Sequence, residues 1–239
     1  MNMSLSRRSV VSLSLLTIAL ATSACDDSVV FVVQTGGRPV DVDLGTLMVP
    51  NELRDEQEGQ ARFVTVPCGP AMSCPSTESF PITCEQSVCD PAPVTISTPI
   101  GDVVDVEALA ADARGLLRHV DAIEILEARY EIQSNTLTTE IPAVEIFWGP
   151  ESATEVDPAM GVVVLGVLAA IPAGATEPGT VNLDAGGVAA LSDYLVSTSR
   201  RVRLLARATL DLSPGGVIPE GALEATVDLR LRITGSLLR

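Results

Sequence analysis

The strongest constraint on the fold is a strict alternation of apolar and polar residues near the C-terminus. Between positions 223 and 233 every second residue is apolar, and the residues between them are charged or carry a hydroxyl. A period of two is typical of a β-strand with one buried and one solvated face. A similar apolar row spans 202–212, and the turn-forming residues 213–216 follow it. We therefore expect these two segments to pair as a long antiparallel hairpin.

Most of the remaining chain also has the pattern of strands. Further strands are expected at 40–49, 62–66, 94–98, 123–132, 143–148 and 162–171. The last is continuously apolar, so it should be buried on both faces or lie in the middle of a sheet. Helices are expected at 106–119 and at 184–197, with Asp184 as an N-cap. The two helices sit in similar strand-helix-strand patterns, which suggests a weak internal duplication. The sequence therefore predicts a mainly β fold, an antiparallel β-sandwich-like domain with two short helical crossovers.

Residues 67–92 interrupt this pattern with many prolines and four cysteines, Cys68, Cys74, Cys84 and Cys89. A segment without apolar periodicity cannot bury enough surface to order itself, so two disulfides are expected to hold it. The spacing allows three pairings and does not choose among them. A zinc site is the alternative, but only Cys84 and Cys89 have a usual ligand spacing and no histidine is near, so no metal or cofactor is expected. The insert is then either a cross-linked surface loop or a rigid recognition loop.

The first 24 residues have the layout of a secretory signal, with Arg7 and Arg8 before an apolar stretch and a run of small residues. The run Thr22-Ser23-Ala24-Cys25 resembles the lipobox of bacterial lipoproteins, and this resemblance covers only the targeting segment. It implies cleavage before Cys25 and acylation of that cysteine. Thr22 stands where the lipobox usually has Leu, so cleavage after Ala21 by the ordinary signal peptidase is the alternative.

Cysteine parity favours the lipidated form, because using Cys25 for lipid leaves an even set of four cysteines for an oxidising compartment. The expected organisation is a signal peptide at 1–24 and one β-rich domain at 25–239, with the insert at 67–92. The mature protein is expected to be exported and lipid-anchored in the bacterial cell envelope, with the outer membrane favoured over the inner. Strand-like sequence starts a few residues after Cys25, so the folded body should lie close to the membrane.

Charge and motif content exclude several functions. The formal net charge is -16 and the chain contains no lysine, so nucleic acid is not an expected partner. The only histidine is His119, and the sequence has no nucleophile elbow, metalloprotease pair or phosphate-binding loop. We therefore expect no enzymatic activity.

The predicted C-terminal hairpin would place four arginines, Arg203, Arg207, Arg230 and Arg232, on one solvated face. They could pair with the acidic strand that carries Glu124, Glu127 and Glu131, or meet an anionic partner such as lipid headgroups.

The leading hypothesis is a non-enzymatic, lipid-anchored envelope protein that acts as a structural or partner-binding module. Its partners would be the membrane, through the N-terminal lipid, and an envelope protein or a lipid. The alternative is a carrier of an apolar ligand or lipid, because a core rich in aliphatic residues and poor in aromatic ones could also line a cavity.

Overall fold

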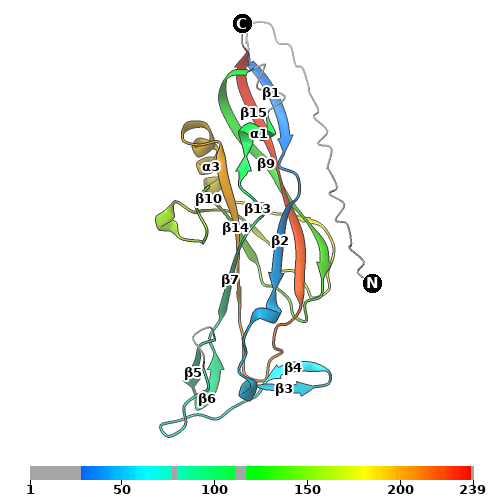
Figure 1. The fold of residues 1–239 in the computed structure, drawn as a ribbon, viewed down its shortest axis with the longest axis vertical. Helices are drawn as coiled ribbons and strands as arrows, with labels where there is room; N and C mark the ends of the chain where they lie inside the picture. Colours follow the sequence, from blue (N-terminus) through cyan, green and yellow to red (C-terminus); the bar gives the residue numbers. More distant parts are fainter. Residues whose placement is uncertain (1–27, 77–79, 111–116, 238–239) are drawn as a thin grey trace, which may run out of the picture.

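Two β-sheets stacked face to face make up most of the molecule, and a small lobe extends from one end of them (Figure 1). The structure is a computed structural model that describes residues 28–76, 80–110 and 117–237. Every strand pair within these residues is antiparallel. The expectation of a mainly β, antiparallel sandwich-like fold is confirmed.

The first sheet is built around its central strand, β15 (Ala222–Leu237). One side of β15 pairs with β9 (Leu117–Asn135), which in turn pairs with the short β12 (Gly179–Thr180). The other side pairs with β1 (Ser28–Gln34) and, further toward the start of β15, with β2 (Arg38–Asp43). The C-terminal alternation therefore marks the strand on which the whole sheet is assembled.

The second sheet has five strands in a row and one short strand beside them. In spatial order these are β13 (Asn182–Leu183), β11 (Val163–Leu168), β10 (Val144–Pro150), β14 (Arg201–Leu210) and β7 (Val94–Pro99), and β8 (Val104–Asp105) also pairs with β14. The continuously apolar segment 162–171 forms β11, an interior strand with neighbours on both sides, as its composition indicated. The two sheets bury one shared aliphatic core between them.

The predicted C-terminal hairpin is wrong, because its two strands belong to different sheets. β14 lies in the second sheet and β15 in the first. The buried faces were predicted correctly, since Leu204 of β14 and Leu229 of β15 are both in the core. Residues 211–221 between them first pass through the small lobe, where Ile218 N–H donates to the carbonyl of Ala61 at 2.8 Å. Alternation determines which face of a strand is buried, but not which strand lies beside it.

One of the two predicted helices is confirmed, and of the other only the first turn is helical within the described residues. The confirmed helix is α3 (Ala185–Ser197), whose N-cap Asp184 accepts a hydrogen bond from the N–H of Gly187 at 2.7 Å. The other helix is α1 (Val106–Leu109), and His119, expected at its end, instead lies in β9. Residues 111–116 lie outside the described part of the chain. Pairing of β9 with β15 down to Leu117 outweighs the local helical preference.

The expected duplication extends only to the start of each unit, where a short strand of the second sheet is followed by a capped helix. Asp105 caps α1 by accepting from the N–H of Ala108 at 2.9 Å, much as Asp184 caps α3. The strands that follow the helices differ in position, because β9 belongs to the first sheet and β14 to the second.

Helix α3 packs closely against the second sheet at Gly187. A Cβ at this position would lie 1.8 Å from the carbonyl oxygen of Val164, so only glycine permits this approach. The carbonyl of Gly187 accepts a hydrogen bond from Trp148 Nε1 at 3.1 Å, and Tyr194 of the same helix packs against the Trp148 ring.

The long axis of the molecule has two distinct ends. The start of β1, the end of β15 and the start of β9 meet at one of them, where Ser236 pairs with Ser28 on one side and His119 on the other. We call this the terminal end. The small lobe, made of residues 50–76, 80–93 and 211–219, lies at the opposite end (Figure 1). We call it the distal lobe.

Candidate functional site in the distal lobe

The distal lobe consists of two short hairpins around a small core of its own. The hairpins are β3 (Arg54–Gln57) with β4 (Gln60–Phe63), and β5 (Ile82–Glu85) with β6 (Val88–Pro91). The core contains Leu53, Ala61, Phe63, Phe80 and Ile218, and the rings of Phe63 and Phe80 stack with centroids 5.8 Å apart. Two-stranded sheets of this size are marginal in water, so the lobe needs additional links.

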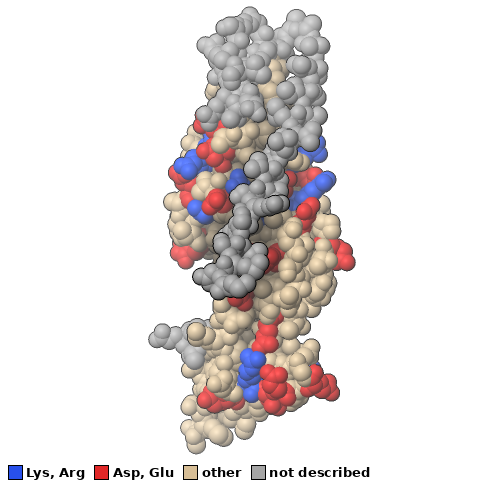
Figure 2. Space-filling model, turned by 45° about the vertical axis from the view of Figure 1, so that its right-hand side comes forward, with Lys and Arg blue, Asp and Glu red and all other residues tan. Residues whose placement is uncertain are grey.

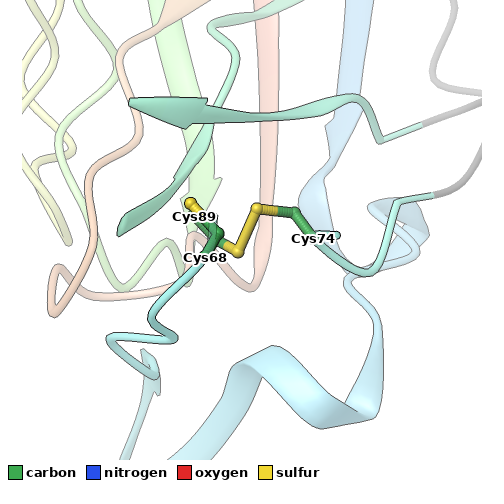
Figure 3. A group of neighbouring side chains, drawn as sticks. All are labelled: Cys68, Cys74 and Cys89. Carbon is green, nitrogen blue, oxygen red and sulfur yellow. A yellow bond between two sulfur atoms is a disulfide. The ribbon is translucent and has the colours of Figure 1, made fainter. Parts of the chain in front are cut away.

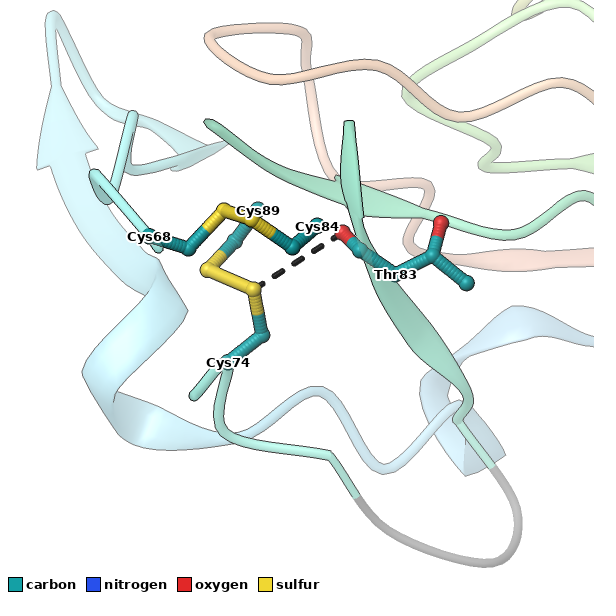
Figure 4. Close-up of a disulfide and its surroundings, with 5 residues drawn as sticks. All are labelled: Cys68, Cys74, Thr83, Cys84 and Cys89. Atoms are coloured by element: carbon teal, nitrogen blue, oxygen red, sulfur yellow. Dashed lines mark hydrogen bonds between the residues drawn. A yellow bond between two sulfur atoms is a disulfide. The ribbon is translucent and has the colours of Figure 1, made fainter. Parts of the chain in front are cut away.

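Two disulfides provide those links within the Cys- and Pro-rich insert (Figure 4). Cys68 is bonded to Cys84 and Cys74 to Cys89, with Cα atoms 5.9 Å and 5.5 Å apart. The prediction of two disulfides is confirmed, and the structure selects one of the three pairings. Both bonds tie the β5–β6 hairpin to the short segment that precedes it.

The two disulfides also lie against each other. The Sγ atoms of Cys68, Cys74 and Cys89 are all within 4.8 Å of one another (Figure 3). Such a cluster could hold a soft metal only as free thiolates, and these sulfurs are bonded in disulfides. The Sγ of Cys74 also lies 3.7 Å from the carbonyl oxygen of Thr83, dashed in Figure 4. A disulfide sulfur has no proton, so this is a van der Waals contact and not a hydrogen bond.

Backbone strain is concentrated in the same lobe. Among the described residues, positive φ outside glycine occurs at Glu58 (54°), Gln86 (49°) and Ser87 (67°). All three lie in the tight turns of the two lobe hairpins. A left-handed conformation costs an ordinary residue about 1–2 kcal/mol, so these turns are held by their surroundings. Gln86 and Ser87 form the whole turn between the strands that carry Cys84 and Cys89.

The surface of the distal lobe is acidic. Its only arginines are Arg54 and Arg62, and acidic residues outnumber them; Figure 2 shows the red acidic side chains around this end of the molecule. Arg54 bridges to Glu220 at 2.6 Å, and this hydrogen bond raises the pKa of the Arg54 guanidinium. The bridge connects the lobe to the residues that lead into β15.

The four arginines proposed as a common face do not share one. Arg203 and Arg207 lie on the outer face of the second sheet, and Arg230 and Arg232 lie on the outer face of the first. The expectation fails because it depended on the hairpin between the two strands. Binding of an anionic partner through either pair stays a prediction.

Several of these arginines have partners within the chain. Arg232 pairs with Glu124 at 2.7 Å, as the structural alternative predicted. Arg207 donates from Nε and one Nη to Glu145 at 2.9 and 2.7 Å, and its guanidinium lies 4.7 Å from the centroid of the Phe147 ring.

The other two arginines of the expected face, Arg203 and Arg230, make different contacts. Arg203 donates to the carbonyl of Glu151 at 3.3 Å. Glu127, expected to pair across the sheet, bridges to Arg129 of its own strand at 2.7 Å and raises the pKa of that guanidinium. Arg230 has no ion pair within the described residues.

A narrow apolar gap between the two sheets bears on the carrier hypothesis. Its lining is mainly aliphatic and comes from both sheets, including Val40, Leu223, Ile96 and Ala208. Its volume is about 50 Å³. Pockets for small-molecule ligands measure about 300–1,000 Å³, so an apolar ligand would have to separate the sheets in order to enter.

Two predicted features of the N-terminal segment cannot be placed. The signal peptide and Cys25 lie outside the described residues, which begin at Ser28.

His119 is exposed at the terminal end, 4.0 Å from the carboxylate of Asp121. Within the described part of the chain, no helix is both long and apolar enough to cross a membrane.

No protein-family model matches the chain, and no curated protein matches its sequence. Two features of the distal lobe were missed by sequence reasoning, the contact between the disulfides and the strained turns. Neither has a signal in spacing alone, because Gln86-Ser87 is not a typical turn pair and the sulfur contact depends on the fold.

Proposed function

We propose that this chain is a non-enzymatic, lipid-anchored protein of a bacterial cell envelope whose β-rich body acts as a structural or partner-binding module. In this proposal Cys25 carries the lipid, and the distal lobe is the part that meets another envelope component.

The observation that carries the proposal is the position of the start of β1. Ser28 lies at the terminal end, and the distal lobe lies at the opposite end of the long axis (Figure 1). Three peptide units separate Cys25 from Ser28, so they reach at most about 10 Å. An acylated Cys25 would therefore hold the terminal end at the membrane surface, and the distal lobe would be the part farthest from it.

The lobe has the properties of a presented binding surface. Two disulfides cross-link it, so little conformational entropy would be lost when a partner binds. Met72, in the loop that carries Cys68 and Cys74, is 53% exposed, one of few large apolar side chains exposed to this degree in the described residues. Exposed loops held by a rigid scaffold are common binding elements.

The anchor is tested by replacing Cys25 with Ser and following the protein in fractionated cells. Wild-type protein should sediment with membranes and be released only by detergent, whereas the variant should not. Membrane attachment that persists in Cys25→Ser chains from which the signal peptide has been removed would contradict the lipid anchor.

The role of the lobe is tested by site-specific photo-crosslinking in intact cells. A photoreactive residue at position 72 should give a discrete adduct. The matched control is position 167 in the sandwich, where Val167 is also exposed and apolar. Adducts from position 167 alone would contradict the assignment of the lobe as the contact surface.

The second candidate is a carrier of an apolar ligand or lipid, and the aliphatic gap between the sheets is the observation that favours it. Its small volume means that a loaded form would have a wider gap. Solvent extraction of purified protein followed by mass spectrometry should release about one lipid per chain from a carrier. Under the leading proposal the extract should contain no lipid, because the acyl groups on Cys25 are covalently bound and stay on the chain.

A further inference from the structure

We propose that the distal lobe is a site of thiol-disulfide exchange, entered at Cys84 and relayed by Cys68 to the neighbouring disulfide. The reacting partner is a thiolate, from either a small thiol or a cysteine of another protein. The inference goes beyond the proposed function and does not depend on the lipid anchor.

Exposure selects the entry point. Cys84 is exposed and Cys74 half-buried, whereas Cys68 is 7% exposed and Cys89 only 2%. Cys84 is the exposed residue of this bonded pair, so an external thiolate is expected to approach the Cys68–Cys84 bond from the Cys84 side. Attack there forms a mixed disulfide on Cys84, breaks the Cys68–Cys84 bond and releases Cys68 as a thiolate.

The released thiolate has a second disulfide beside it. Its Sγ lies within 4.8 Å of both Cys74 and Cys89 (Figure 3). Attack on Cys89 forms a Cys68–Cys89 bond and expels Cys74 as a thiolate, and attack on Cys74 would expel Cys89 instead. Desolvation disfavours a buried thiolate, which favours onward attack by the released Cys68 and makes the half-buried Cys74 a better leaving group than Cys89. The second step exchanges one disulfide for another and needs no oxidant or reductant.

The exchange changes what holds the β5–β6 hairpin. In the native pairing both strands are tied to the segment 68–74 (Figure 4). After the exchange β5 has lost its link, and only β6 remains tied. The turn at Gln86 and Ser87 is strained and the strands have four residues each, so β5 should loosen. The exposed surface of the lobe would then respond to thiols.

The test uses the chain with Cys25→Ser, which removes the fifth cysteine and leaves the lobe unchanged. The protein is exposed briefly to reduced glutathione, quenched with acid, labelled with N-ethylmaleimide and mapped by peptide mass spectrometry. The expected product carries one glutathione on Cys84, label on Cys74 and a new Cys68–Cys89 bond. Label on Cys68 with the Cys74–Cys89 bond intact would overturn the relay, and absence of glutathione on Cys84 would overturn the entry point.

A second measurement avoids any dependence on glutathione. A phosphine reductant opens a disulfide without forming a mixed one, and the species with one remaining disulfide can be trapped by the same label. Label on Cys84 and Cys74 is expected, with Cys68 bonded to Cys89. The matched control, Cys74→Ser with Cys89→Ser, has no second disulfide and should carry the label on Cys68 and Cys84. If that variant does not fold, the wild-type map alone still decides the proposal.

Discussion

Cys84 lies directly opposite Cys89 across the β5–β6 hairpin, and neither is bonded to the other. Each crosses instead to the preceding segment, Cys84 to Cys68 and Cys89 to Cys74. The two bonds close loops with sequence separations of 16 and 15, so a single short segment fixes both strands of the hairpin. The order of the lobe should therefore depend on both cross-links.

Removing either disulfide should destabilise the lobe and leave the sandwich folded. Replacing Cys74 and Cys89 by Ser should lower the free energy of unfolding of the lobe by about 3 kcal/mol, because loops of about 15 residues gain that much entropy when opened. Limited proteolysis should then cut within 67–92 at an increased rate. The variant with Ser at Cys68 and Cys84 should behave alike, and loss of the β-sheet circular dichroism in either variant would contradict this view.

Gly187→Ala should disrupt the packing of α3 against the second sheet. The added Cβ would meet the carbonyl of Val164 at 1.8 Å, and backbone cannot move aside as a side chain can. The free energy of unfolding should fall by at least about 3 kcal/mol. It can be measured by urea unfolding monitored through the fluorescence of Trp148, the only tryptophan. The control is Gly186→Ala, where the nearest atom is a carboxylate oxygen of Asp184 at 3.2 Å. It should change stability by less than about 1 kcal/mol.

Arg207→Met should have a small effect that depends on salt. The Glu145 and Arg207 side chains are 40% and 34% exposed, so their ion pair and the contact with Phe147 together contribute about 1 kcal/mol. A double-mutant cycle with Glu145→Gln should show a coupling energy that shrinks at high salt. Arg230→Met removes an arginine without an ion pair within the described residues and should be close to neutral. Equal losses of stability in Arg207→Met and Arg230→Met would argue against the ion pair between Arg207 and Glu145.

Thr35→Val should lower the stability of the protein more than the small change in side-chain shape suggests. The Thr35 hydroxyl donates to Asp228 at 3.0 Å and accepts from the N–H of Leu229 at 2.9 Å, and the residue is 6% exposed. Valine keeps the shape but leaves the buried N–H without a partner, which costs about 1–3 kcal/mol. Thermal unfolding should show a lower midpoint. Thr209→Val, at an exposed hydroxyl near Thr95, should leave the midpoint almost unchanged.

Local patterns in the sequence predicted most of the strands, the N-cap at Asp184 and the presence of two disulfides. They did not predict how strands are placed beside one another. The alternation around Leu204 and Leu229 identified buried faces correctly, yet these faces meet across the core and not side by side. A period of two carries information about a face and none about a neighbour.

The same limit applies to the distal lobe. Spacing among the cysteines allowed three pairings, and the choice depends on how the segment 68–74 lies against the hairpin. The end of the helix expected at 106–119 is instead part of β9, because the ladder with β15 extends to Leu117. In each case a contact distant in sequence decided the outcome, and single-sequence patterns do not report such contacts.

In the proposed arrangement an acylated Cys25 anchors the terminal end, and the disulfide-linked distal lobe lies at the other end. The most direct test of this arrangement is the intact mass of the protein from its native membrane fraction, measured before and after reduction and alkylation. The lipid-anchored protein should begin at Cys25, carry added acyl mass, and gain four alkyl groups only after reduction. An unmodified chain that begins at Thr22, with a fifth cysteine open to alkylation, would contradict the arrangement.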